Sequence, residues 1–185
     1  MHTLWLASGS PRRRELLTQL AVNFSVIKTD VDESQLPNEA PAAYVERLAQ
    51  AKALAGFVAG GRQLPALGAD TIVVVDDQVL GKPVDEADFM RMMQLLQHRS
   101  HHVMTAVAIQ TATQLLQTRV TTEVWFGPMS QDQMRAYWQS GEPADKAGGY
   151  GIQGLAGRYI EKIHGSYFAV VGLPLYETAA LLEQL

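Results

Sequence analysis

The sequence predicts an α/β fold with a mixed, twisted sheet, flanking helices and a long antiparallel hairpin. Near the N-terminus, short apolar runs alternate with helical patterns, which is typical of β–α units. Further along, two longer strand patterns at about 102–110 and 115–126 follow one another directly, which indicates a hairpin. The 185 residues are 47% hydrophobic and contain no repeat or Pro/Ser-rich linker, so we expect one domain over residues 1–185.

The first strand–helix unit is marked by its turn. Residues 3–7 form an apolar strand that stops at Ser8. Ser10 is placed as the N-cap of the following helix, and Pro11 as its first residue.

A second helix is predicted from Pro41 to about Gly60. Val45, Leu48 and Ala55 fall on one face, and Lys52 lies on the same face. A lysine on an apolar stripe either extends its ammonium to solvent or meets a buried anion.

The remaining elements rest on caps, turns and β-branched runs. In chain order they are a strand at 24–27, a buried strand at 71–75 that turns at Asp76-Asp77 into a short partner, a helix capped by Asp85 to about 97, the hairpin strands, a helix with a Ser130–Gln133 capping box to about 139, strands at 158–163 and 168–171, and a helix after Pro174.

Composition excludes several function classes. The net charge of -4 argues against a general binder of nucleic acids or anionic membranes. With no cysteine, the chain has no thiol nucleophile, disulfide or thiolate metal site. No signal-peptide pattern or apolar run of 18 residues occurs, so we expect a cytoplasmic protein.

Three arginines, Arg12, Arg13 and Arg14, follow the Ser-Gly-Ser-Pro turn. A helix N-terminus already carries partial positive charge, so cations gathered there indicate an anion site. Backbone amides and the hydroxyls of Ser8 and Ser10 suit a phosphate. Taken alone the turn is weak evidence, because a simple cap followed by a solvent-exposed basic face explains it as well or better.

Asp70 is the sharper signal, because it precedes a β-branched buried run and needs a cation or a metal beside it. A three-residue loop at 75–77 would place Lys82 opposite Asp70, and a shifted register would move that contact by one residue. A purely structural Asp–Lys pair is the alternative.

Other candidates are weak singly. Glu33 lies in an acidic loop whose carboxylates could simply be exposed to solvent. Lys146 precedes the glycine-rich segment 148–154. His101 and His102 are adjacent, so they point to opposite faces of a strand and do not suit a two-histidine metal site. Together, however, these cations and carboxylates match a polyphosphate and its divalent cation.

The sequence resembles the Maf-type nucleoside triphosphate pyrophosphatases over essentially the whole chain. The matching motifs, in order, are "ASGSPRR", "VDES", "RLAQAKA", "GADTIVV", "GKP", "MTAVA", "SGEPADKAGGYGIQG" and "GSYFAVVGLPL". The resemblance implies a Maf/ITPase-like fold and a house-cleaning enzyme of the cytoplasm, commonly a homodimer. It implies hydrolysis of a nucleoside triphosphate to the monophosphate and pyrophosphate with Mg²⁺ or Mn²⁺.

The resemblance also implies which bases are preferred. In the family, residues matching Arg12, Thr71 and Gln153 accompany a preference for dTTP and UTP, whereas the subgroup for 7-methyl-GTP differs at all three positions. The implied catalytic and metal-binding residue is Asp70, with Glu33 as the second metal ligand. Implied phosphate ligands are Ser8, Ser10, Arg12, Arg13, Lys52, Lys82 and Lys146.

Three other functions stay open at this point. They are a 7-methyl-GTP pyrophosphatase on the same scaffold, a nucleotide-binding regulator of cell division, and a nucleic-acid binder that uses the arginine cluster. The acidic net charge disfavours the last of these.

Overall fold

The computed structural model describes residues 3–185, and these form two compact units. Unit 1 comprises residues 3–71, 105–120 and 172–185, and unit 2 comprises residues 72–104 and 121–171.

The elements alternate along the chain much as the hydrophobic pattern predicts. The strands are β1 (Thr3–Leu6), β2 (Asn23–Val26), β3 (Ala66–Val75), β4 (Gln78–Leu80), β5 (Arg99–Gln110), β6 (Leu115–Phe126) and β7 (Ile160–His164). The α-helices are α1 (Pro11–Gln19), α2 (Pro41–Ala59), α3 (Glu86–Leu96), α4 (Gln131–Gln139), α5 (Tyr167–Val171) and α6 (Leu175–Leu182), and the 3₁₀ helices are η1 (Glu142–Asp145), η2 (Ala147–Gly149) and η3 (Leu155–Tyr159).

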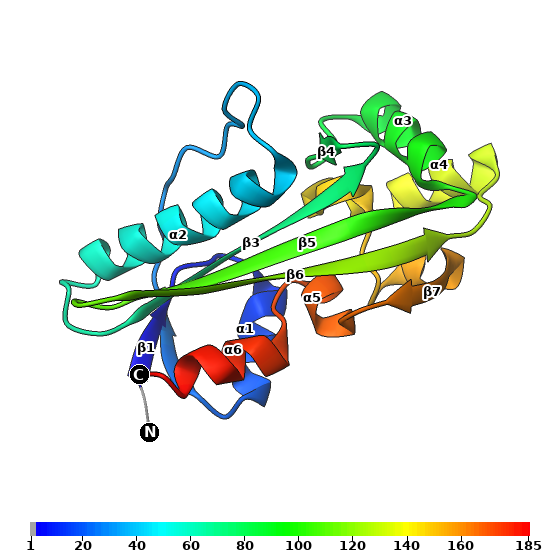
Figure 1. Ribbon diagram of the computed structural model, residues 1–185. Helices are drawn as coiled ribbons and strands as arrows, with labels where there is room; N and C mark the ends of the chain where they lie inside the picture. The colour runs from blue at the N-terminus through cyan, green and yellow to red at the C-terminus, as the bar shows by residue number, and fades with distance from the viewer. Residues whose placement is uncertain (1–2) are drawn as a thin grey trace. The chain divides into compact units, whose positions relative to one another are not determined.

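Among the described residues, the strands form one seven-stranded sheet in the order β2-β1-β3-β5-β6-β7, with β4 paired to β3 (Figure 1). β1 runs parallel to β2 and β3, whereas β4 and β7 are antiparallel to β3 and β6. β5 and β6 are sheet neighbours joined by a tight turn in which Thr111 N–H bonds the carbonyl of Gln114, so they form the expected hairpin. The predicted mixed α/β fold is confirmed.

In unit 1, α2 lies on one face of the sheet and α1 and α6 lie on the other (Figure 1). The α1 start is confirmed: Pro11 is its first residue, and Ser10 Oγ accepts a 3.4 Å hydrogen bond from Arg13 N–H. That bond satisfies one of the amides that a helix start leaves unpaired.

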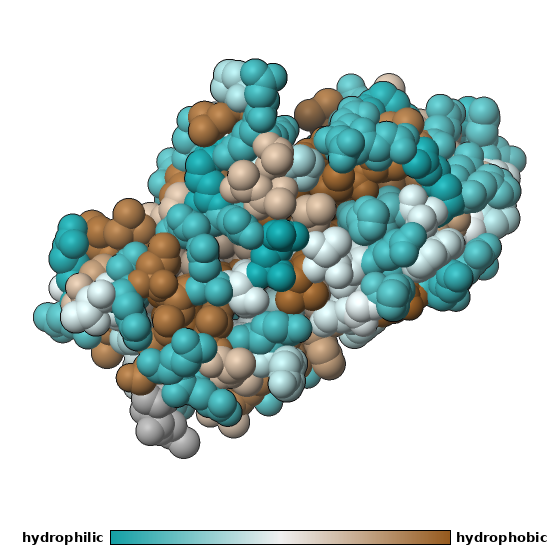
Figure 2. Space-filling view, in the orientation of Figure 1, coloured by the Kyte–Doolittle hydropathy of each residue, from teal (hydrophilic) through white to brown (hydrophobic). Residues whose placement is uncertain are grey.

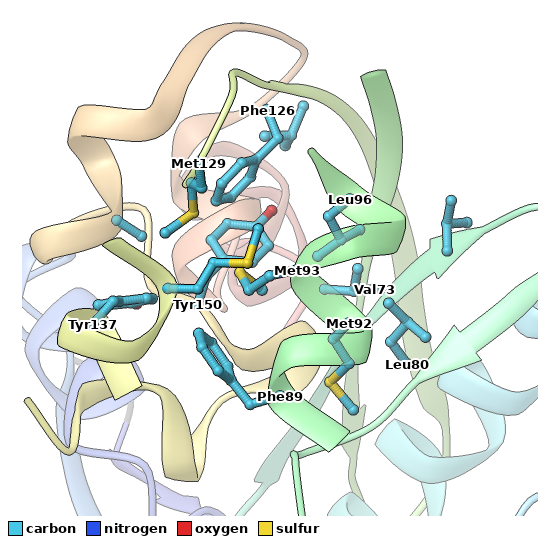
Figure 3. Packing of buried hydrophobic residues seen from close by; sticks show 14 of the residues in the cluster. Val73, Leu80, Phe89, Met92, Met93, Leu96, Phe126, Met129, Tyr137 and Tyr150 are labelled. Carbon is cyan, nitrogen blue, oxygen red and sulfur yellow. The ribbon is translucent and has the colours of Figure 1, made fainter. Parts of the chain in front are cut away.

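Unit 2 has its own apolar core. Figure 3 shows Phe89 and Met93 of α3, Tyr137 of α4 and the aromatic residues Phe126 and Tyr150 gathered around it. The predicted caps are confirmed here as well, since Asp85 caps α3 and a Ser130–Gln133 capping box opens α4.

The predicted strand at 168–171 is wrong, because this segment is the short helix α5. Its aromatic and β-branched residues favour a strand locally, but Ser166 Oγ accepts from Ala169 N–H at 3.2 Å and starts a helix. Thr122 Oγ1 accepts from Ser166 N–H at 3.0 Å and fixes that cap. The preceding strand begins at Ile160 rather than at 158, because residues 155–159 form η3.

The loop expected at 75–77 is one residue shorter in the structure. Asp76 and Asp77 alone form the turn, both with positive φ (48° and 60°), which matches the twist that a two-residue hairpin needs. Val75 therefore pairs with Gln78, and the ladder ends at Leu80, before Lys82. Lys82 is thus not paired across the strands with Asp70, and the register that would have placed them opposite each other is corrected.

No helix within residues 3–185 is long and apolar enough to span a membrane.

Candidate active site

The turn between β1 and α1 forms a small polar cradle in unit 1. Ser8 Oγ accepts hydrogen bonds from Ser10 N–H at 3.2 Å and from the Arg13 guanidinium at 3.4 Å. The amides of Ser10, Arg13 and Arg14 are already bonded within this turn, so hydroxyl and guanidinium groups are what the cradle offers to an anion. Arg12 is half-buried on the same turn, whereas Arg14 is exposed.

Arg13 joins three segments that are far apart in the sequence. Its Nε donates to the carbonyl of Gly172 at 2.9 Å, and another guanidinium nitrogen donates to Thr71 Oγ1 at 3.1 Å. Thr71 Oγ1 also lies 2.9 Å from Thr105 Oγ1. Gly172 adopts a φ of 130°, which favours glycine.

Burial and the nearby carboxylates shift the pKa of Arg13 in opposite directions. Burial lowers the pKa of Arg13, and the Asp70 carboxylate partly offsets that effect. Since arginine starts from a very high pKa, the group stays a cation that is aimed at the β1–α1 turn.

Asp70, near the middle of β3, is paired with Lys52 of α2. Lys52 Nζ lies 2.7 Å from Asp70 Oδ1 and 2.6 Å from Glu33 Oε1. Asp70 is 8% exposed, so its charge needs such a partner. The sequence predicted a cation beside Asp70, and the structure identifies it as Lys52 rather than Lys82.

Gly68 explains why α2 can bring Lys52 to this point. A Cβ on Gly68 would lie 2.3 Å from Ala53 N and 2.5 Å from Ala49 O, both backbone atoms of α2. The helix backbone therefore packs directly on β3, two residues before Asp70.

The loop that carries Glu33 is irregular but well fastened to α2. Tyr44 Oη donates to the Glu33 carbonyl at 2.6 Å, and Arg47 bonds both the Ser34 carbonyl and the Glu39 carboxylate. The Arg47 guanidinium lowers the pKa of Glu39. Polar residues make up most of the projecting tip of this segment (Figure 2).

The donor set fits a divalent cation that is shared with a phosphate ligand. Within the described residues, no three His, Cys, Asp or Glu side chains form a metal-binding group, so an all-protein cage is not available here. Glu33 and Asp70, however, direct carboxylate oxygens to one point, because both reach the same ammonium. Mg²⁺ is commonly bound by one or two carboxylates together with substrate phosphates.

The other candidates lie in unit 2. Lys82 is exposed, directly after Gly81, whose carbonyl accepts from Gly148 N–H at 2.9 Å. This bond joins the Lys82 segment to the glycine-rich segment that follows Lys146. Lys146 Nζ bonds the Glu142 carbonyl at 2.6 Å and Asp145 at 2.8 Å. Gln153 is exposed further along the same segment.

Sequence reasoning did not assign several residues of these networks. Thr105 stands as a polar residue within an apolar strand, which was an available signal. Tyr44, Arg47 and Gly172 offered none beyond the family motifs, because their partners are distant in sequence.

His101 packs in the core and His102 lies on the opposite face of β5, as the adjacency of the two residues predicts. His101 is 1% exposed and lies 2.6 Å from Tyr150 Oη, while His102 is exposed. Burial lowers the pKa of His101 to about 3, so this imidazole is neutral at physiological pH.

The motif series agrees with a comparison against known families. The model of the family described as "Maf-like protein" matches residues 3–185. The chain belongs to the Maf family. Among similar Maf proteins, one from Pseudoalteromonas translucida is 57% identical over 98% of this chain and 96% of its own length, and is named "dTTP/UTP pyrophosphatase". One from Vibrio cholerae, with the same name, is 54% identical over 98% of this chain and 97% of its own length.

A solved structure supports the fold of this Maf protein. The Ham1 protein of Staphylococcus aureus superposes with a TM-score of 0.50 at 13% identity, covering 67% of this chain and 71% of the other. At that identity the likeness concerns the fold alone, and it agrees with the expected Maf/ITPase-like architecture.

Proposed function

We propose that this Maf protein hydrolyses UTP and dTTP to the nucleoside monophosphate and pyrophosphate. The observation that carries the proposal is the Glu33–Lys52–Asp70 cluster, found in a chain whose close relatives are named for that activity.

Glu33 and Asp70 are the residues that would hold Mg²⁺ or Mn²⁺. When bound, this cation would polarise the phosphate oxygens and neutralise part of their charge. Lys52 would keep the two carboxylates together and supply a further positive charge next to the phosphates.

We assign Asp70 the role of general base. A carboxylate held in a fixed orientation by Lys52 can orient and deprotonate the water that attacks the α-phosphorus. No covalent intermediate is required, since the leaving pyrophosphate is stabilised by cations.

Phosphate binding is assigned to Ser8, Ser10, Arg12 and Arg13, together with Lys52, Lys82 and Lys146. Hydrogen bonds from hydroxyl, ammonium and guanidinium groups are short and strong when the acceptor is charged, and they strengthen as charge moves onto the leaving group. Arg12, Thr71 and Gln153 are assigned to base preference. A neutral amide can donate to O4 and accept from N3–H of uracil or thymine.

The test is a panel of nucleotides. Pyrophosphate release is measured from UTP, dTTP, CTP, GTP and 7-methyl-GTP, each with Mg²⁺, with Mn²⁺ and with a chelator. We expect release from UTP and dTTP that the chelator abolishes. Preferred release from 7-methyl-GTP would identify the other Maf specificity, and tight binding without release would favour a nucleotide-binding regulator.

The homodimer and the cytoplasmic location that the resemblance implies remain predictions. Light scattering of the purified protein tests the first, and cell fractionation tests the second.

A further inference from the structure

Gln153 sits in a four-residue turn. Gly154 N–H donates to the carbonyl of Gly151 at 3.0 Å, so Ile152 and Gln153 occupy the two central positions. Gln153 is exposed there, directly before η3 begins at Leu155.

Two side chains outside the turn hold both of its ends. Gly151 N–H donates to Tyr137 Oη at 3.2 Å, and Leu155 N–H donates to Glu142 Oε2 at 2.9 Å. Tyr137 Oη in turn donates to Glu142 Oε1 at 2.7 Å, which links the two anchors. Tyr137 is 4% exposed and packs in the unit 2 core, near Phe89 (Figure 3), so the anchor is rigid.

Gly154 shows how closely the Glu142 carboxylate approaches the turn. A Cβ at this position would lie 2.3 Å from Glu142 Oε2. The backbone angles of Gly154 (φ -106°, ψ -150°) do not require glycine. Glycine is needed here because a side chain would collide with the Glu142 carboxylate.

Glu142 also reaches the cationic side of this segment. Its carbonyl accepts from Lys146 Nζ at 2.6 Å. One residue therefore orients a predicted phosphate ligand through its backbone and the Gln153 turn through its side chain.

We propose that Tyr137 and Glu142 are positioning residues that set the nucleobase preference by fixing the Gln153 turn. This inference rests on the proposed function. A glutamine amide suits uracil when its NH₂ faces O4 and its oxygen faces N3–H, but a flipped amide would suit cytosine, whose pattern is reversed. The side chain alone therefore does not reject CTP. A fixed turn keeps the amide at one distance and angle from the base, so that the groups around it can select one of the two amide orientations.

The anchor requires a carboxylate at position 142. Its carboxylate accepts two hydrogen bonds at once, from a hydroxyl and from a backbone amide. A glutamine in its place has one oxygen. If that oxygen accepts from Leu155 N–H, the NH₂ meets Tyr137 Oη, which already accepts from Gly151 N–H and would lose the acceptor for its own proton, so the link between the two anchors would be weakened.

The test measures kcat/KM for UTP and for CTP in Tyr137→Phe, Glu142→Gln and Gly154→Ala. The first two variants each remove an anchor. In the third variant, the added methyl group displaces the Glu142 carboxylate. Because residue 154 is exposed, this variant gives a result even if the buried tyrosine variant folds poorly. We expect the ratio of UTP to CTP to fall on the order of tenfold in each folded variant. The matched control is Asp132→Asn, which removes an exposed ion pair with Arg135 on the same helix as Tyr137 and should keep the wild-type ratio.

Equal losses for UTP and CTP in all three variants, or a wild-type protein that does not prefer UTP to CTP, would overturn the inference alone. A wild-type protein that releases pyrophosphate from none of the nucleotides would overturn the proposed function and the inference with it.

Discussion

Lys52 in α2 donates a 2.7 Å hydrogen bond to the carboxylate of Asp70 in β3, at a point where Gly68 lets the helix backbone touch the strand. The contact places a cation and a carboxylate of low exposure side by side, and Glu33 joins them from an irregular loop. A charge pair of this kind adds little net stability compared with an apolar contact of the same size. Its value lies in the fixed orientation that it gives the Asp70 carboxylate.

Asp70→Asn should lower turnover by about 10²–10⁴-fold, because asparagine keeps the shape but is neither a base nor a strong metal ligand. The free energy of unfolding should change by only about 1 kcal/mol, since Lys52 retains Glu33 as a partner. Pyrophosphate release and urea denaturation measure the two effects. Near-normal activity in the folded variant would remove Asp70 from the mechanism.

Arg13→Lys should lower kcat/KM for UTP by on the order of 10²-fold, since lysine keeps the charge but loses the planar fork that bonds Gly172, Ser8 and Thr71. Steady-state kinetics with UTP measure this change in kcat/KM.

The matched control is Arg14→Ala, one residue along α1, where the side chain is exposed. It should keep nearly full activity. Full activity in Arg13→Lys would show that the charge alone matters and that the fork does not, and a large loss in Arg14→Ala would show that the charge of the α1 start matters beyond Arg13.

Gly68→Ala should destabilise the protein by about 1–3 kcal/mol, because the added methyl group meets backbone atoms of α2 that cannot rotate away. Activity should fall as well, since α2 carries Lys52. Urea denaturation measures the first effect. Gly81→Ala serves as the comparison, because a Cβ there meets nothing within 4 Å and should cost little. Similar losses in both variants would point to glycine flexibility rather than close packing.

Stability should depend on pH through His101. Burial lowers its pKa to about 3, with further lowering by His102 and Arg99, whereas the unfolded chain protonates this group near pH 6.5. Between these values the unfolded state binds the extra proton, so the free energy of unfolding falls as the pH drops. The loss from this group should be about 2 kcal/mol between about pH 7.5 and pH 5.

The check is urea denaturation at several pH values for the wild type, His101→Gln and His102→Gln. The pH slope should be smaller in the His101 variant and unchanged in the His102 variant, whose side chain is exposed. An unchanged slope in His101→Gln would mean that other groups cause the acid sensitivity.

Local signals explain which parts of the fold could be predicted. The caps at Ser10, Asp85 and Ser130 act within one helical turn, so they are visible in the sequence. The α5 helix was missed because its start depends on Ser166 held by Thr122, a contact 44 residues away. A one-residue difference in the β3–β4 turn was enough to alter the expected partner of Asp70.

The site likewise contains residues that the sequence pattern reveals and residues that it does not. Asp70 and Lys52 stood out because each is a charge in an apolar pattern, and the structure brings them together. The roles of Tyr44, Arg47 and Glu142 depend on hydrogen bonds to backbone atoms of loops, which no residue pattern encodes.

Hydrolysis of UTP in water enriched in ¹⁸O tests the central claim most directly. If Asp70 directs water to the α-phosphorus, mass spectrometry should find UMP and pyrophosphate, with the label in UMP and none in pyrophosphate. Label in pyrophosphate would mean attack at the β-phosphorus. Release of UDP with labelled inorganic phosphate would contradict the account altogether, since the protein would then act as a phosphatase on the terminal phosphate.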